Sequence, residues 1–312
     1  MTGVLPHLST RRALSLLGVL LVSLAVACGA AAAPKAVSVN PQLDRSEDAL
    51  NPILATTVLR TGAQRVSFLL TTPKALVKAP QATVTSKFLE GDGATGETRQ
   101  AIFHLWPYGI RGAYSTELTF ERPGRWQLDI SVDDAQFSGA TQLVVDVAET
   151  SEVPDIGMVP PKSRTKTLSS AGGFEALTTD FTPDPDLYQV TVAEAISSGR
   201  PAVIVFSTPA FCTSPTCGPQ VDTLSELKER HQGEANFVHV EIYDNPAEIQ
   251  GDLSKAEVTQ AVHDWGFTRI PGWFNESWSF VLDRQGRIEQ RFEGFVTLEE
   301  LEESLQEALA RS

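Results

Sequence analysis

Short apolar runs alternate with amphipathic segments in the C-terminal part of the chain. Residues 201–206 and 236–242 are rich in β-branched and other apolar side chains, which is typical of buried strands. Residues 191–198 suit a short helix before the first run, and Gly199 suits the end of that helix. Between the two runs, apolar residues at spacings of three predict a longer helix that begins near Pro219.

The same alternation continues towards the C-terminus. Residues 257–265 suit a further helix, and residues 278–282 and 287–292 suit the two arms of a hairpin. Thr297 and Glu300 have the spacing of a capping box, which predicts the start of a last helix with four leucines on one face. The pattern therefore predicts an α/β domain over residues 186–312.

Residues 40–148 follow a different pattern, in which apolar and polar residues alternate with a period of two. Short runs of this kind, separated by turn residues, predict an all-β antiparallel sandwich. The segment ERPGRWQLDISV, residues 121–132, resembles the closing hairpin of small immunoglobulin-like domains on exported bacterial proteins. The candidate strands are residues 66–70, 82–85, 114–120, 126–132 and 143–147.

The segment between these two regions has the composition of a linker. Residues 149–185 carry five prolines interspersed with serine, threonine and glycine, and they offer few apolar side chains to bury. An extended connector that lies over the surface is expected here. The length of 312 residues agrees with two domains of ordinary size.

The N-terminus has the features of an export signal. Arg11 and Arg12 precede the uncharged apolar run 13–27, which is shorter than the roughly 20 residues needed to span a bilayer. The twin arginines resemble a twin-arginine signal. The string that ends in Cys28 resembles a bacterial lipobox, in which the cysteine is lipidated, although Ala25 and Ala27 also suit ordinary signal cleavage just before Cys28. We therefore expect a signal peptide over residues 1–27 and a lipid-anchor tether over residues 28–39.

Composition and charge narrow the classes of function. Hydrophobic residues make up 42% and charged residues 21% of the chain, so there is enough apolar mass for two cores. The formal net charge is −14. This sign argues against nucleic-acid binding, because phosphate contacts need clustered Lys and Arg. No phosphate-cradling loop or zinc-ligand spacing is present, and no cofactor is expected.

Two of the three cysteines are candidates for redox chemistry. Cys212 and Cys217 lie in the loop between a predicted buried strand and the helix that begins near Pro219. A helix N-terminus lowers the pKa of a nearby thiol, and a second thiol can resolve a mixed disulfide. In an oxidising compartment the same pair could instead be a structural bridge. The third cysteine, Cys28, is explained by lipidation.

The order strand, cysteine loop, helix, strand, helix, hairpin and final helix resembles the thioredoxin fold. VIVFSTPAFC resembles the strand and the approach to the redox cysteine in exported thioredoxin-like proteins of the TlpA type. FVLDRQGRIEQRFEG resembles the hairpin of the same proteins, and the resemblance spans residues 186–310. It implies a thiol–disulfide oxidoreductase whose partners are protein thiols or disulfides of the cell envelope.

The cysteine motif departs from that of thioredoxins. Four residues separate Cys212 from Cys217, whereas thioredoxins have two. The string Cys217-Gly218-Pro219-Gln220 matches the thioredoxin motif except for its last residue, so two alignments compete. The distance from the preceding strand favours Cys212 as the nucleophile and Cys217 as the resolving thiol.

The proline that normally faces the redox cysteines in the cis form has no clear counterpart. Counting back from the hairpin places Ser277 in this position, and Pro271 is the only proline nearby. If Ser277 fills the position, substrates dock differently from those of thioredoxin.

Two other activities fit parts of the sequence. The CTxxxCG string resembles that of atypical peroxiredoxins, although Pro209 stands where a Thr or Ser is expected, and Glu276 and Ser277 stand where an arginine is expected. Copper(I) chaperones of the Sco type pair two loop cysteines with a distant histidine, and soft thiolates suit copper(I). The candidate histidines would be His231, His239 and His263.

Taken together, the sequence predicts an exported bacterial lipoprotein at the outer face of the cytoplasmic membrane. A β-sandwich of immunoglobulin-like type would precede a thioredoxin-like domain that exchanges disulfides through Cys212 and Cys217.

Overall fold

Seven antiparallel strands form the N-terminal part of the structure. The computed structural model describes residues 49–91, 95–107, 109–273 and 277–311, all of which lie in one compact unit, Lys35–Ser312. The expected signal peptide and tether, residues 1–39 with Cys28, lie outside the described residues. The strands are β1 (Asn51–Leu54), β2 (Gly62–Thr71), β3 (Gln81–Phe88), β4 (Thr95–Leu105), β5 (Gly112–Phe120), β6 (Gly124–Asp133) and β7 (Ser138–Val147).

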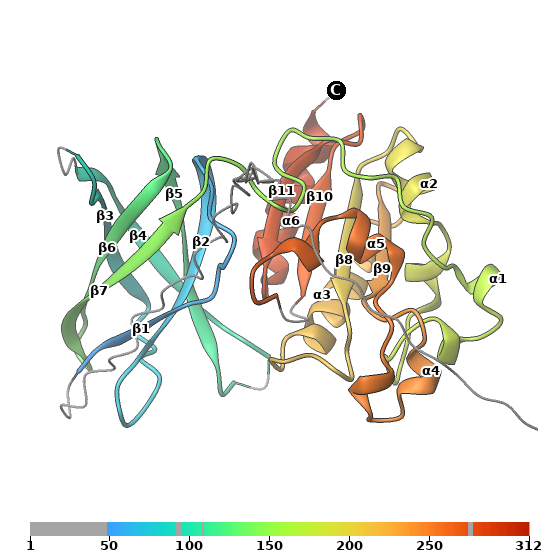
Figure 1. Cartoon of the computed structure of the whole chain (residues 1–312), viewed down its shortest axis with the longest axis horizontal. Helices are drawn as coiled ribbons and strands as arrows, with labels where there is room; N and C mark the ends of the chain where they lie inside the picture. Colours follow the sequence, from blue (N-terminus) through green and yellow to red (C-terminus); the bar gives the residue numbers. More distant parts are fainter. Residues whose placement is uncertain (1–48, 92–94, 108, 274–276, 312) are drawn as a thin grey trace, which may run out of the picture. The chain divides into compact units, whose positions relative to one another are not determined.

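These strands form one continuous sheet and not the two sheets of an immunoglobulin-like sandwich. Their order is β1-β2-β5-β4-β3-β6-β7. The two outer strands, β1 and β7, contact each other, and Arg60 pairs with Ala148 in a parallel bridge, so the sheet curls into a near-barrel (Figure 1). The expectation of an all-β domain is therefore confirmed, whereas a sandwich is not what the strand order forms. Period-two alternation fits a sandwich and a near-barrel equally well, because both architectures bury one face of every strand.

The core of the near-barrel follows from that alternation. Along β3 the side chains of Ala82, Val84, Ser86 and Phe88 are buried while those between them are at least partly exposed. Trp126 is 2% exposed and lies between two phenylalanines, with each pair of ring centroids 5.2 Å apart. Aromatic pairs at this distance add about 0.5–1.5 kcal/mol beyond the area that they bury.

The C-terminal part contains a four-stranded mixed sheet in the order β11-β10-β8-β9. The strands β8 and β9 are parallel, and β10 is antiparallel to both β8 and β11. The sequence-based prediction of strand, loop, helix, strand, helix, hairpin and helix is confirmed. The strands are β8 (Ala202–Ser207), β9 (Asn236–Glu241), β10 (Trp278–Leu282) and β11 (Ile288–Glu293).

Helices cover both faces of this sheet (Figure 1). Alternate residues of β8 divide between two cores: Ile204 and Phe206 pack with α2 and α5, whereas Val203 and Val205 pack with α3 and α6. Because both faces are buried, β8 reads as a continuous apolar run. The longer elements are α2 (Val192–Ser197), α3 (Cys217–Arg230), α5 (Gln260–Asp264) and α6 (Leu298–Ala310), and the short ones are α1 (Leu168–Ala171), η1 (Phe174–Ala176), η2 (Pro185–Tyr188), α4 (Pro246–Ile249), η3 (Leu253–Lys255) and η4 (Phe267–Arg269).

The proline-rich segment 149–185 packs closely against the C-terminal sheet. Val153 and Leu177 are buried in the cores on its two faces. The backbone of Gly157 donates to the carbonyl of Ile288 at 2.7 Å, and Ile288 donates to Met158 at 2.9 Å. These two bonds lie along β11, which is an outer strand of the sheet, so the segment covers that edge.

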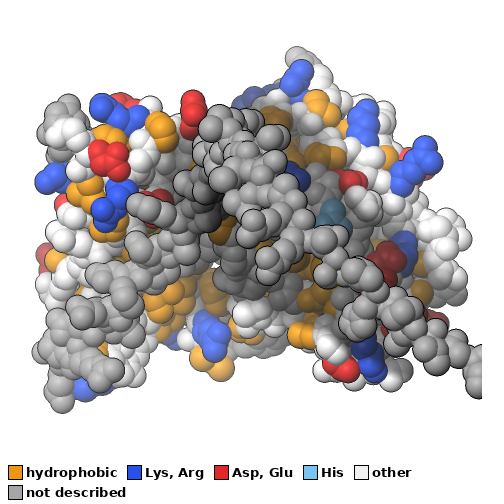
Figure 2. Space-filling view, in the orientation of Figure 1, with side chains coloured by type: hydrophobic (Ala, Val, Ile, Leu, Met, Phe, Trp, Pro, Cys, Tyr) orange, Lys and Arg blue, Asp and Glu red, His pale blue; other side chains and the backbone are white. Residues whose placement is uncertain are grey.

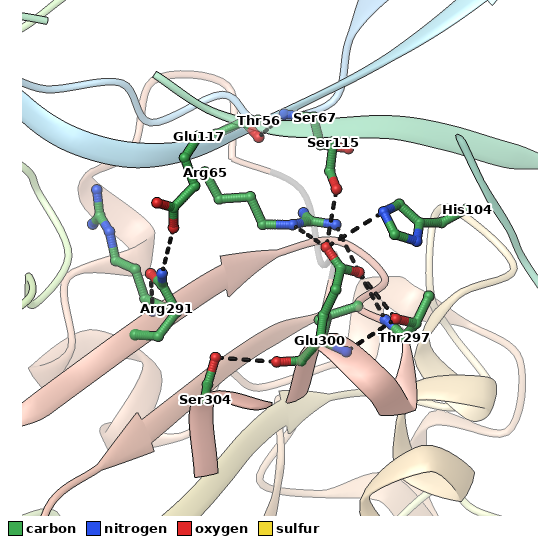
Figure 3. A network of polar contacts seen from close by, with 12 residues as sticks. Thr56, Arg65, Ser67, His104, Ser115, Glu117, Arg291, Thr297, Glu300 and Ser304 are labelled. Atoms are coloured by element: carbon green, nitrogen blue, oxygen red, sulfur yellow. Dashed lines mark hydrogen bonds and ion pairs between the residues drawn. The ribbon is translucent and has the colours of Figure 1, made fainter. Parts of the chain in front are cut away.

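A polar network joins the two halves of the described chain (Figure 3). Glu300 on α6 accepts hydrogen bonds from both Nε and a terminal nitrogen of Arg65 on β2, at 2.9 and 3.3 Å, and from the hydroxyl of Ser115 on β5 at 2.9 Å. His104 Nε2 lies 3.7 Å from the same carboxylate. Burial alone would raise the pKa of Glu300, but Arg65 and the hydrogen bonds lower it, so the carboxylate is charged at neutral pH.

Candidate functional site

Cys212 and Cys217 form a disulfide between the end of β8 and the start of α3. Their Cα atoms are 5.9 Å apart. Cys217 is the first residue of α3 and is fully buried, whereas Cys212 is partly exposed in the preceding loop. The hydroxyl of Ser207 donates to the carbonyl of Cys217 at 3.0 Å, which ties the end of β8 to the first turn of the helix. A partner molecule therefore has access to the sulfur of Cys212 first.

The helix places the two sulfurs in different environments. Thr216 is the N-cap residue of α3, and its side chain makes no capping hydrogen bond. The first backbone N–H groups of a helix carry partial positive charge, which favours a thiolate at its first residue. Cys217 is thus placed to be a good leaving group when Cys212 is attacked, because a stabilised thiolate leaves faster.

Gln220 takes the place of the second cysteine of the thioredoxin motif. Its side chain is fully buried in the first turns of α3, and its Oε1 accepts a hydrogen bond from the backbone of Val296 at 2.9 Å. This contact fastens α3 to the segment before α6. Gln220 has a structural role here, and Cys217 is left to pair with Cys212.

A buried histidine lies next to the strand that leads into the cysteine loop. His239 Nε2 is 3.3 Å from the carbonyl of Ser207, and Nδ1 is 2.7 Å from the hydroxyl of Tyr188. Burial lowers the pKa of His239 to about 4, so the ring is neutral. Because a carbonyl only accepts, Nε2 carries the proton and Nδ1 accepts from Tyr188.

Replacing Tyr188 by phenylalanine tests this arrangement. The Tyr188→Phe variant leaves Nδ1 of His239 buried without a donor, so the free energy of unfolding should fall by about 1–3 kcal/mol. Urea unfolding followed by tryptophan fluorescence measures the loss. The matched control is Tyr114→Phe in the near-barrel, because the hydroxyl of Tyr114 donates to the carbonyl of Ala79 at 2.9 Å. Tyr188→Phe should speed the hydrogen exchange of backbone amides in the cysteine loop, and Tyr114→Phe should leave that exchange unchanged.

A buried carboxylate supports the other side of the cysteine loop. Glu241, at the end of β9, is 5% exposed and accepts from the backbone and the hydroxyl of Thr179, both at 2.8 Å. Thr179 Oγ1 in turn accepts from the backbone of Ala210 in the loop at 3.2 Å. Burial raises the pKa of Glu241 to about 6. The sequence analysis missed this residue, although His239 and Glu241 stand two apart on a buried strand, which places both on one face.

The two candidates for the position opposite the cysteines have different surroundings. Pro271 lies in a turn after η4, and no cis peptide bond occurs among the described residues, so its bond is trans. Ser277 is fully buried immediately before β10, and its carbonyl accepts from Gly294 at 2.9 Å.

The candidate copper ligands are each engaged away from the disulfide. His231 pairs with Glu234 and Glu302, and His263 lies 3.2 Å from the hydroxyl of Thr268. His239 is held by Tyr188 and Ser207. Within the described ranges, no cluster of three or more His, Cys, Asp or Glu side chains could hold a metal ion.

The surroundings of the CTxxxCG string also differ from those that peroxide reduction needs. Thr208 is fully buried, and its hydroxyl lies 3.4 Å from that of Thr179 in the network of Glu241. A groove opens beside Cys217, and no arginine is found among the described residues that line it. The hydroxyl and cation that would activate a peroxide are thus not brought to the cysteines by this part of the chain.

The surface carries both signs of charge. On the face that Figure 2 shows, the described Lys and Arg side chains are interspersed with Asp and Glu. No helix in the described portion is long and apolar enough to cross a bilayer.

Comparison with known proteins finds similarity to solved structures alone. No model of a protein family matches the chain, and no curated protein matches it. Among solved structures, the chain is similar to a thiol:disulfide interchange protein of the thioredoxin family from Chlorobium tepidum TLS. The identity is 12% and the TM-score 0.31, over 44% of this chain and 97% of that chain.

Proposed function

We propose that the C-terminal domain catalyses thiol–disulfide exchange with protein partners through Cys212 and Cys217. The observation that carries the proposal is the unequal setting of the two sulfurs: Cys212 is accessible, whereas Cys217 is buried at the first residue of a 14-residue helix. A purely structural bridge needs no such difference. Thiol exchange does, because one sulfur must meet the partner and the other must leave or resolve.

The reaction follows from this setting. In the reducing direction the Cys212 thiolate attacks one sulfur of a partner disulfide, the partner S–S bond breaks, and the released thiolate takes up a proton. Cys217, as a thiolate, then attacks the sulfur of Cys212 and releases the second partner thiol. Two electrons pass to the partner, and the Cys212–Cys217 disulfide forms. The oxidising direction is the reverse of these steps.

The proposal extends to where the reaction takes place. The apolar run 13–27 and Cys28 support export and lipidation at the outer face of the cytoplasmic membrane. Such a compartment supplies partner thiols and disulfides. Metabolic labelling with a palmitate analogue tests the anchor: wild-type protein should be labelled, and Cys28→Ala should not.

A redox titration tests the exchange activity. The reduced fraction of the Cys212–Cys217 pair is measured by mass spectrometry in dithiothreitol buffers. A reversible couple above about −270 mV, the value of thioredoxin, is expected of an exchange protein. A bridge that resists reduction below about −300 mV would mark it as structural and refute the proposal.

Two single variants separate the roles of the cysteines. Cys217→Ser should trap a mixed disulfide between Cys212 and a partner, because the resolving thiol is missing. Cys212→Ser should trap none, because the buried Cys217 does not reach a protein partner. The opposite pattern would reverse the assignment, and trapping by neither would remove the basis for exchange.

A further inference from the structure

A groove of about 340 Å³ opens beside the disulfide, on the side of α3 and the segment 180–182. Polar and apolar residues both line it, and three of the lining residues are prolines: Pro209, Pro215 and Pro219. Cys217 also contributes to the lining. A partner segment bound to Cys212 that extends along the Cys217 side of the disulfide would lie in the groove.

The charges in the groove have one sign. Asp180 and Asp222 are the only charged side chains among its described lining residues, and neither forms an ion pair within the described structure. Partial burial, followed by repulsion from Asp180, raises the pKa of Asp222. Two carboxylates that repel each other are relieved when a positive group comes between them.

An apolar side chain stands next to these carboxylates. Phe181 is 90% exposed, the highest value of any large apolar residue described. Its neighbours hold the segment in place: Asp180 accepts from the backbone of Thr182 at 2.9 Å, and Thr179 is bound to Glu241. A turn that hydrogen bonds hold in place therefore presents the ring to the solvent, where a partner can contact it.

Gly218 keeps the groove open. A Cβ built on this residue has no atom within 4 Å, although Gly218 lies in the first turn of α3. A larger side chain would thus enter the groove without a clash inside the protein. Alanine would suit a helix better than glycine by about 1 kcal/mol, so the small residue has a cost that an open groove explains.

We propose that this groove selects protein partners whose reactive cysteine is flanked by Lys or Arg and by an apolar side chain. The inference rests on the proposed exchange function and names its substrate class. The basic group would lie between Asp180 and Asp222, and the apolar group would pack on Phe181. Charge complementarity of this kind mainly raises the rate of association.

The test compares three peptides, each with one intramolecular disulfide and the same leucine neighbour. They differ in one flanking residue, which is Arg, Gln or Glu. Stopped-flow kinetics with the reduced protein should give a rate constant about 10-fold higher for the Arg peptide than for the Glu peptide. The ratio should fall towards one in 0.5 M NaCl, because salt screens exposed charges.

Variants assign the effect to the groove. Asp180→Asn with Asp222→Asn should bring the Arg and Glu peptides within about 2-fold of each other. The ratio of two peptides on one variant cancels any change in thiol reactivity. The matched control is Asp133→Asn with Asp146→Asn, two exposed carboxylates of the near-barrel, which changes the net charge equally and should keep the selectivity.

A third variant tests the apolar and steric parts. Gly218→Leu should slow all three peptides while leaving reaction with dithiothreitol close to the wild-type rate, because only the larger partners need the groove. Equal rates for the three peptides on the wild-type protein would overturn this inference while exchange itself stands. No exchange with any peptide or with glutathione disulfide would overturn the proposed function, and the inference with it. If added Ca²⁺ changed the rate constants while the flanking residue of the peptide did not, the carboxylates would be a cation site. That result would also overturn the inference.

Discussion

Replacement of Glu300 by alanine is expected to lower the free energy of unfolding by about 3 kcal/mol. Glu300 is the acceptor for Arg65, whose side chain is 8% exposed, and for Ser115. Its carboxylate also accepts from the backbone and hydroxyl of Thr297 in the capping box of α6. The variant leaves a buried guanidinium without its counter-charge, and this uncompensated charge accounts for most of the loss. Urea unfolding at pH 7 measures it.

Two controls separate charge from capping. Glu300→Gln keeps a side chain that can cap the helix, so it reports the lost ion pair alone. Glu299→Ala removes an exposed carboxylate from the same turn and should cost less than about 1 kcal/mol. A loss for Glu300→Ala no larger than that for Glu299→Ala would show that the network of Figure 3 adds nothing to stability.

The second large effect concerns the pH dependence of stability. Glu293 on β11 accepts from the backbone N–H groups of Thr57 and Val58 at 2.7 and 3.2 Å and from the hydroxyl of Thr57. Burial raises its pKa from 4.5 to about 7, against the opposing effect of these bonds. Because the folded pKa is the higher one, this contribution to stability is complete below pH 4.5 and is lost as the pH rises through 7.

The variant Glu293→Gln should remove this dependence. About 1.4 kcal/mol per pH unit between 4.5 and 7 gives about 3.5 kcal/mol for an enclosed group, and the partial exposure of Glu293 reduces it to roughly 2 kcal/mol. The difference in unfolding free energy between variant and wild type should therefore grow by that amount from pH 4.5 to pH 8.5. Glutamine can accept from both N–H groups and donate to the Thr57 hydroxyl. Parallel curves for the two proteins would contradict the assignment.

The C-terminal fold could be predicted because local and long-range signals agree there. The capping box at Thr297 begins α6 as expected, α2 lies within the helix predicted over residues 191–198, and the buried runs become β8 and β9. The predicted helix 257–265 is shorter in the structure, where α5 begins only at Gln260. Residues before it pair instead, through the bridge of Tyr243 with Val258. Helix boundaries are set by such tertiary contacts, which a periodic pattern does not contain.

The near-barrel could be predicted only as an all-β domain. Alternation shows which side chains of a strand are buried, but it carries no information on which strands are neighbours. The closing contact depends on Arg60 and Ala148, which lie 88 residues apart and show no pattern in common. The role of the segment 149–185 was hidden for a similar reason, since its few apolar residues, such as Val153 and Leu177, are enough to fasten it.

The cysteine pair of the site was visible in the sequence, and its supporting residues were not. Cys212 and Cys217 stand out by residue type and by their place before a helix. Glu241, Thr179 and Phe181 are ordinary residues until the fold brings them to the cysteine loop. Only the pairing of polar residues two apart on β9 hinted at this side of the site.

The segment that borders β11 has a consequence for association between copies of the chain. An outer strand with unpaired N–H and C=O groups is a template on which another molecule can add a strand, the first step towards fibrils. Gly157 and Met158 already occupy the groups of Ile288, so this position is closed to intermolecular strand addition. A stretch of chain that joins two domains thereby also protects the protein from cross-β assembly at this edge.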